Sequence, residues 1–326
     1  MPNVVTSPTA PLDSMVDHSW LSDDQKTAFA SAAFVPDRVS VSQYLSPWLV
    51  SNGYMAEFFR KNEVIIDDVR ITACLMNQAL DFIHRAICNT VAHYILAQKG
   101  LETWARVTNY YASYFSVHSL LCLQGRTITR LELNKPQEVH VVPIDLRSHV
   151  FGVTHRHLGT RPHHEAPWKR FYGIYDRYAV SHAAFEVVSR RAYVTEPTDE
   201  SDQRNTLNYT PFKGFAEILD LARYKAFSDG FSKYVAALEA RSTLAEFLDD
   251  LQGYATDPEY KYFARTLLKL ALAGDIVLAI RQGSQAIDME WVNVIERWKN
   301  FLGTLFPDPT ECYLLKFIPL IGSSVN

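Results

Sequence analysis

The clearest pattern in the chain is a pair of long amphipathic helices. From Asp67 to Gln98, apolar residues return every three or four positions, which is typical of one face of a helix, and Gly100 follows as a stop signal. Glu102 to Leu123 repeats this pattern with wider apolar coverage and is closed by Gly125. A turn this short predicts two antiparallel helices packed side by side.

The pattern changes after Gly125. Residues 127–144 alternate between apolar and polar around a turn that contains Pro136, which predicts a β-hairpin. Residues 146–167 have no sustained period and predict loop or short-strand backbone, and a helical stripe resumes at Trp168. Upstream, residues 35–53 contain Pro36 and Pro47 and are expected to be irregular.

The acidic stretch Thr195 to Asn205 is expected to be a surface loop that separates two regions. Beyond it, residues 212–251, 258–272 and 289–305 have helical periodicity. We therefore predict a mainly α protein, a helical bundle with a small β-hairpin insertion. Its expected parts are a flexible N-terminal arm (1–20), a helical domain (21–194) with the hairpin and a His/Arg-rich loop (127–167), and a C-terminal helical region (206–326).

Composition narrows the class of protein. The 326 residues are 48% hydrophobic, enough for a sizeable core, and a pI near 6.3 argues against a protein that coats nucleic acid with its whole surface. The four cysteines form no CxxC pair, and neither a secretory signal nor an apolar run long enough to cross a membrane is present. These features predict a reduced, cytoplasmic protein without a membrane partner.

Charge is unevenly distributed. The segment from His140 to Arg191 holds seven of eleven histidines and eight of thirty-two Lys and Arg residues, against four acids, so it carries a formal +4 in a chain of −4. Such a segment attracts anions. Its basic residues could bind nucleic acid, with Trp168, Tyr172 and Tyr175 as stacking platforms, unless the cations pair with surface acids and the rings face the core. The candidate phosphate contacts are Arg147, Arg156, Arg161, Lys169 and Arg170.

The same histidines are candidate ligands for a metal ion. His155 and His157 alternate along the chain, and three neighbours are within loop reach: His149, His163 and His164. A Cys pair, an HExxH motif and a carboxylate cluster are all missing from this segment, so we assign it neither a metal nor another cofactor.

One arginine–histidine pair suggests RNA cleavage that needs no metal. Arg177 and His182 have four residues between them, a spacing at which long side chains on a helix can converge on one groove. Arginine could hold a scissile phosphate while histidine moves a proton, the two roles needed when a 2′-hydroxyl cleaves RNA. A second pair of similar spacing, Arg156 and His163, occurs as frequency alone predicts.

The run NYYASYFSVHSLLCLQG, Asn109 to Gly125, resembles the YYAxFxxxxxLL helix of HEPN-type proteins, helical-bundle proteins of prokaryotic toxin–antitoxin and antiphage-defence systems. Many members are metal-independent endoribonucleases that use Arg-x(4–6)-His, commonly as dimers. The resemblance implies catalytic roles for Arg177 and His182, RNA as substrate, and a homodimer or a partner protein. Tyr178 and Ala184 depart from residues common around the family motif, so a non-catalytic binding subunit of a larger defence complex is the alternative.

Aromatic and histidine residues on the predicted helices also have a simpler interpretation. Side chains at this density on one helix usually form core. We therefore expect Tyr110, Tyr111 and His118 to lie in the interior, and likewise His84 and His93.

Overall fold

The computed structural model describes the central part of the chain and several later helices. The described residues are 39–54, 60, 63–68, 70–132, 139–147, 150–154, 165–175, 199–209, 220–240, 250, 253–254, 257, 260–281, 293, 296–298 and 300–305. At some of these positions, Arg147 among them, only the backbone is described.

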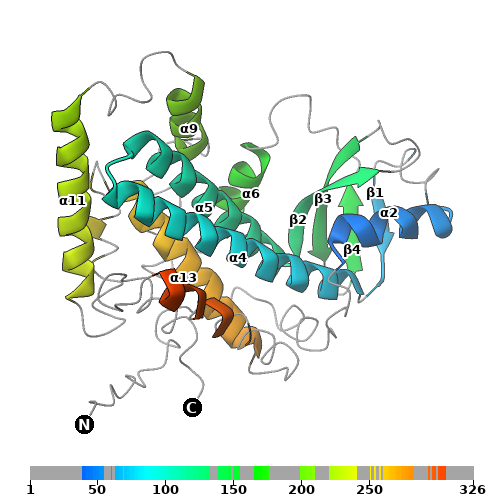
Figure 1. Cartoon of the computed structure of the whole chain (residues 1–326). Helices are drawn as coiled ribbons and strands as arrows, with labels where there is room; N and C mark the ends of the chain where they lie inside the picture. Colours follow the sequence, from blue (N-terminus) through cyan, green and yellow to red (C-terminus); the bar gives the residue numbers. More distant parts are fainter. Residues whose placement is uncertain are drawn as a thin grey trace, which may run out of the picture.

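Two long antiparallel helices form the centre of the molecule (Figure 1). Helix α4 spans Arg70–Gln98 and α5 spans Glu102–Leu123, and the two pack along their length. Their facing side chains are buried and belong to one hydrophobic core. The prediction of a mainly α protein built on this helix pair is confirmed.

The turn between α4 and α5 depends on Gly100. Its φ of 72° lies in the left-handed region, and the amide of Leu101 donates to the carbonyl of Leu96 while that of Gly100 donates to Ala97, which is a Schellman cap. A Cβ at Gly100 would lie 2.6 Å from a ring carbon of Tyr224 on α11. The sharp turn therefore also allows a later helix to pack closely.

Four further helices surround this pair. Helix α6 (Glu165–Tyr175) and α9 (Asp199–Tyr209) pack against α5, α11 (Leu221–Glu239) packs against α4, and α13 (Lys261–Arg281) contacts both α4 and α5. Buried residues of α6, α11 and α13 join the same core as those of α4 and α5. Helices far apart in the sequence are thus held on one central pair.

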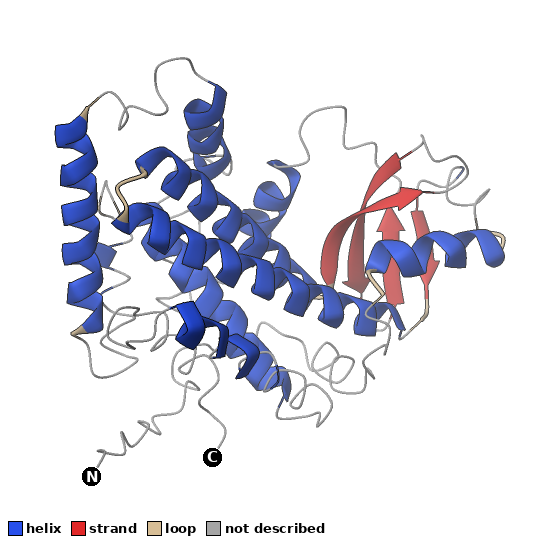
Figure 2. Cartoon of the chain, in the orientation of Figure 1, coloured by secondary structure: helices blue, strands red, loops and turns tan. Residues whose placement is uncertain are grey.

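A four-stranded antiparallel sheet lies at one end of the bundle (Figure 2). Its order is β1-β4-β3-β2, with β1 at Glu63–Ile66, β2 at Arg126–Glu132, β3 at Val139–Arg147 and β4 at Val150–Thr154. Strands β2 and β3 confirm the predicted hairpin, with Thr127 opposite Ile144. The sequence did not predict β1, because a strand of four residues is too short to show a clear period.

Two segments are more regular than predicted. Val41–Ser51, expected to be irregular, is helix α2, which contains Pro47 and begins at a capping box made by Ser40 and Gln43. Within the stretch predicted as an acidic loop, Asp199 begins α9, and the acids of its first turn favour the helix N-terminus electrostatically. Both errors arose because Pro and acidic residues were treated as loop signals. Acidic residues also suit the first turn of a helix, and Pro47 is accommodated inside α2.

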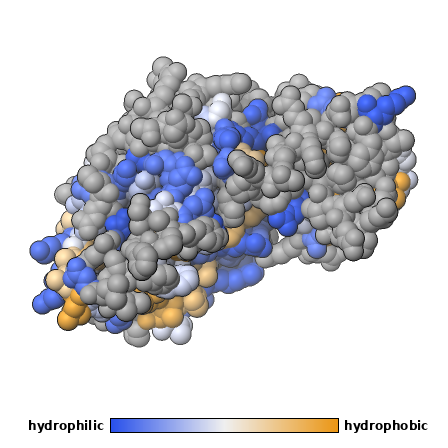
Figure 3. Space-filling view, turned by 90° about the horizontal axis from the view of Figure 1, so that it is seen from above, coloured by the Kyte–Doolittle hydropathy of each residue, from blue (hydrophilic) through white to orange (hydrophobic). Residues whose placement is uncertain are grey.

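The surface of the described residues is mostly hydrophilic on the face in Figure 3, with apolar residues gathered toward one edge. None of the described helices is long and apolar enough to cross a membrane.

Candidate functional site

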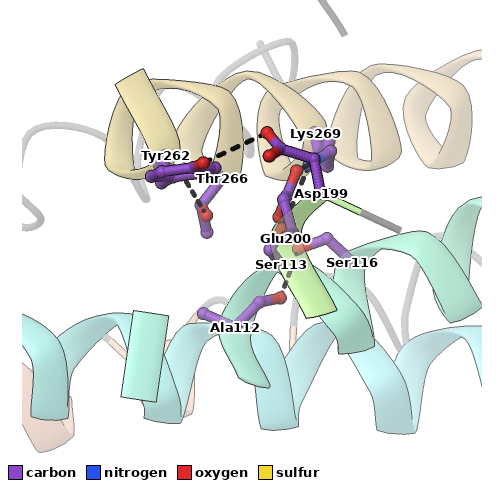
Figure 4. A network of polar contacts seen from close by, with 8 residues as sticks. All are labelled: Ala112, Ser113, Ser116, Asp199, Glu200, Tyr262, Thr266 and Lys269. Carbon is purple, nitrogen blue, oxygen red and sulfur yellow. Dashed lines mark hydrogen bonds and ion pairs between the residues drawn. The ribbon is translucent and has the colours of Figure 1, made fainter. Parts of the chain in front are cut away.

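The most concentrated polar chemistry among the described residues is a buried cluster joining α5, α9 and α13 (Figure 4). Lys269 Nζ donates to Glu200 Oε1 at 2.5 Å and to Ser113 Oγ at 2.7 Å. Ser113 Oγ in turn donates to Glu200 Oε2 at 2.5 Å. The three side chains therefore close a triangle in which each polar group has a partner.

The ring of Trp168 completes the surroundings of the lysine. Lys269 Nζ lies 4.9 Å from its centroid, so the ammonium has two hydrogen-bond acceptors and an aromatic face around it. Burial lowers the pKa of Lys269, while the negative charge of Glu200 acts in the opposite direction. The ion pair keeps a charge in a place where an isolated ammonium would be very costly.

Burial decides what this cluster can do. Ser113 and Lys269 are 0% exposed and Glu200 is 3% exposed. A serine beside a lysine has the composition of a nucleophile and its base, but a substrate cannot reach these atoms in this structure. We conclude that the cluster holds three helices together.

A second contact lies beside the triangle. Tyr262 on α13 donates its hydroxyl to Asp199 Oδ2 at 3.1 Å, so α9 and α13 are joined through adjacent acids. Burial, reinforced by the neighbouring Asp199, raises the pKa of Tyr262. This phenol remains protonated and acts as a hydrogen-bond donor at neutral pH.

The aromatic residues of α5 contact one another in a row along the helix. Tyr110 and Tyr114 stack at 6.0 Å, and Tyr114 meets His118 edge-on at 4.5 Å. Arg204 of α9 donates to the Tyr111 hydroxyl at 2.9 Å. Tyr110, His118 and His93 are buried as expected, whereas Tyr111 and His84 are only half-buried and lie at the edge of the core.

The predicted catalytic pair, Arg177 and His182, lies outside the described residues. Arg156 and Arg161 also lie outside them, and Arg147 is described only as the backbone end of β3. Whether these residues share a groove therefore stays a prediction.

The two remaining candidate phosphate-binding residues lie on α6. Lys169 is exposed and pairs with Glu165 one turn earlier at 3.0 Å. Arg170 is half-buried, and its Nη2 donates to the carbonyl of Ile144 at 3.3 Å, which ties α6 to the sheet. Lys169 is thus placed to meet a ligand from solvent, whereas Arg170 has a contact within the fold.

The stacking role considered for two aromatic residues is wrong for this conformation. Trp168 is 0% exposed and Tyr172 is 2% exposed, because both face the core from α6. Trp168 lies 6.2 Å from Tyr110 and 6.1 Å from Tyr172, so its ring is used within the bundle. Both rings are buried because they lie on the apolar face of α6.

The histidines considered as metal ligands, His149, His155, His157, His163 and His164, lie outside the described residues. Within the described part of the chain, three or more His, Cys, Asp or Glu residues do not come together as a metal site would require.

The sequence did not point to the cluster at Ser113, Glu200 and Lys269. Ser113 and Lys269 are 156 positions apart, and Glu200 sits in a stretch predicted to be a loop. One signal was present: Lys269 interrupts the apolar run TLLKLALAG in the middle of a helix. A single charge at a core-facing position predicts a buried partner of opposite sign.

Comparisons with known proteins add no relative. No family model, no curated protein and no solved structure matches the chain. The likeness of Asn109 to Gly125 to the HEPN helix therefore rests on those residues alone.

Proposed function

We propose that this chain is a HEPN-like helical protein of prokaryotic defence or toxin type, acting in the cytoplasm as a metal-independent endoribonuclease. The observation that supports the proposal best concerns α5. The run resembling the HEPN helix is the centre of the bundle, and its Tyr110 packs against Trp168 of α6. Arg177 follows the end of α6 by two residues in the chain, and His182 by seven.

The proposed chemistry needs only side chains of this chain. The Arg177 guanidinium would hold the scissile phosphate through paired N–H donors and stabilise the charge that develops there. His182 would exchange protons with the reacting oxygens. The 2′-oxygen of RNA attacks the adjacent phosphorus, the P–O5′ bond breaks, and the products end in a 2′,3′-cyclic phosphate and a 5′-hydroxyl.

Cations that precede this pair in the sequence would bring the substrate. Lys169 projects from α6 into solvent, and Arg147 ends β3 just before the positively charged His/Arg-rich loop. Such cations attract the RNA backbone without reading its sequence, so binding should weaken steeply with salt.

A second candidate function, a non-catalytic subunit that binds a partner protein or a second copy, is favoured by exposed apolar residues at one end of the bundle. Leu221, at the first turn of α11, is 77% exposed, and Trp104, at the first turn of α5, is 49% exposed. These two helix ends belong to the region where the α4–α5 turn meets α11 through Gly100 and Tyr224. Exposed apolar side chains of this size are common in protein interfaces.

Expression in a bacterial host separates the two functions. Under the nuclease proposal, the wild-type chain arrests growth, and Arg177→Ala and His182→Ala each restore it at equal protein level. His163→Ala, from the second Arg–His pair, and Arg85→Ala, at an exposed arginine paired with Asp81, serve as matched controls and should still arrest growth. Growth arrest that persists in Arg177→Ala and His182→Ala would exclude the proposed catalytic pair and favour the binding subunit.

A further inference from the structure

Helix α9 is attached to the bundle in a different way from its neighbours. Its sequence, DESDQRNTLNY, is polar except for Leu207 and Tyr209. Among the side chains described on α9, none joins the hydrophobic core, whereas α6, α11 and α13 each contribute several. A helix without an apolar face gains little from burial, so the attachment of α9 depends on polar contacts.

Two acids hold the first turn of α9 (Figure 4). Glu200 accepts hydrogen bonds from Lys269 of α13 and from Ser113 of α5, each at 2.5 Å. Asp199 accepts from the hydroxyl of Tyr262 on α13 at 3.1 Å. Both acids therefore reach from α9 to donors on the helices that it covers.

The next turn of α9 adds a further polar contact. Arg204 Nη2 donates to the Tyr111 hydroxyl of α5 at 2.9 Å. Release of α9 would exchange this bond, and those of the two acids, for bonds to water, so each contributes little net free energy. The buried ion pair behaves in the same way, because release restores the hydration of both charges. Detachment of α9 therefore costs less than detachment of an apolar helix of the same length.

The donors that Glu200 occupies have the chemistry of an anion site. Lys269 Nζ and Ser113 Oγ lie 2.7 Å apart, and they donate to the two oxygens of the Glu200 carboxylate. The Trp168 ring lies 4.9 Å from Nζ and favours the charged ammonium. If α9 left, the ammonium would lose its counter-charge, and two donors would converge on one oxyanion position. A phosphate group offers acceptor oxygens of the same kind.

We propose that α9 is an autoinhibitory strap: its Glu200 carboxylate occupies the position of an RNA phosphate on Lys269 and Ser113, and single-stranded RNA binds there after α9 detaches. The proposal rests on RNA being the substrate, and it adds a regulatory step to that function. The strap competes with the substrate because both bring an anion to one cation. The apparent affinity for RNA is then reduced to the extent that α9 is attached.

Hydrogen exchange followed by mass spectrometry tests the strap in the wild-type full chain. A short single-stranded RNA should speed exchange of the α9 amides by about threefold or more, because it favours the detached state. Inorganic phosphate at the same phosphate concentration should not, because a single anion lacks the neighbouring contacts of an RNA chain. Unchanged or slower exchange in α9 with RNA, or an equal effect of inorganic phosphate, would overturn the proposal.

Glu200→Gln should strengthen RNA binding, measured by fluorescence anisotropy of a labelled single strand. In the attached state Lys269 would lack its counter-charge, so the detached fraction increases and the affinity should rise about tenfold. Asp81→Asn, which removes the acid of an exposed ion pair with Arg85, is the matched control and should change the affinity less than about twofold. Equal affinities of the two variants would contradict the strap.

Two further variants locate the effect. Tyr262→Phe keeps every charge and removes only the hydroxyl bonded to Asp199, so it should raise the affinity about threefold in a chain whose ion pair is intact. Lys269→Met/Glu200→Gln should bind RNA no more tightly than the wild type, because the cation is missing. A gain of affinity that persists in the double variant, or no gain in Tyr262→Phe, would refute the assigned site.

The strap and the proposed nuclease function fail separately. Tighter RNA binding by Glu200→Gln in a chain that cleaves no RNA would refute only the nuclease. RNA cleavage that depends on Arg177 and His182, combined with equal affinities of Glu200→Gln and Asp81→Asn, would refute only the strap.

Discussion

Lys269 of α13 and Glu200 of α9 form an ion pair at 2.5 Å, and neither side chain is more than 3% exposed. Ser113 of α5 bonds to both partners, so one contact point links three helices that are distant in the sequence. A buried pair of this kind adds little net stability compared with an apolar replacement, but loss of one partner leaves an uncompensated charge.

Lys269→Met should therefore destabilise the protein strongly. Glu200 would keep its charge in the core without the ammonium, and the expected loss is about 3–5 kcal/mol in the free energy of unfolding. Urea denaturation followed by circular dichroism measures it. Lys169→Met, which breaks an exposed pair with Glu165, is the matched control and should cost about 0.5 kcal/mol or less.

Removal of both charges should be milder than the sum of the two single changes. In Lys269→Met/Glu200→Gln no unpaired charge remains, so part of the lost stability should return, with a coupling of about 1–3 kcal/mol. A double-mutant cycle from urea midpoints measures this coupling. Additive effects would mean that the two residues are not paired.

Ser113→Ala should have an intermediate effect. Glu200 loses one donor and Lys269 one acceptor, but the ion pair remains, and the expected loss is about 1–3 kcal/mol. Ser116→Ala is the matched control on the same helix, because that buried hydroxyl bonds only a carbonyl of its own helix, that of Ala112. An equal loss in both variants would contradict a special role of Ser113.

Gly100→Ala should destabilise the protein more than Gly53→Ala. Both glycines have φ near +70°, so each substitution carries a conformational cost of about 1–2 kcal/mol. Only at Gly100 does the new Cβ meet another group, the Tyr224 ring at 2.6 Å, whereas nothing lies within 4 Å at Gly53. Thermal unfolding of the two variants compares them, and equal losses would show that α11 does not pack on this turn.

His93 should make stability depend on pH below neutrality. Its pKa is about 4 in the folded protein and 6.5 without burial, so between these values the unfolded chain binds a proton that the folded chain does not. The stabilising effect is complete above pH 6.5 and decreases as pH falls toward 4, by about 3 kcal/mol in all. Urea denaturation at pH 5 and 7 should show this decrease, and His93→Gln should reduce it.

The central helices could be predicted from the sequence because their signals are local. The stop signals at Gly100 and Gly125 fixed the ends of α4 and α5, and the predicted second helix, Glu102 to Leu123, matches α5 in full. Residues 127–144 alternate on both sides of a turn that contains Pro136, and this is the hairpin of β2 and β3. Where one short-range pattern decides the structure, the prediction holds.

The buried cluster could not be predicted because it depends on long-range packing. The acids at the start of α9 have the composition of a loop, and only contact with Lys269 and Ser113 makes burial of Glu200 favourable. Two buried acceptors without a hydrogen-bond partner, His93 Nε2 and Asn109 Oδ1, likewise become visible only when α4, α5 and α11 are assembled. The sequence predicts His93 as a core residue but not the atom that it leaves unpaired.

The most direct test of the proposed function is cleavage of a single-stranded RNA by the purified full chain in excess EDTA. The nuclease account predicts products with 2′,3′-cyclic phosphate and 5′-hydroxyl ends, and a loss of about a hundredfold or more in rate for Arg177→Ala and His182→Ala, with His163→Ala unchanged. Cleavage that EDTA abolishes, or that persists at the wild-type rate in both variants, would contradict it.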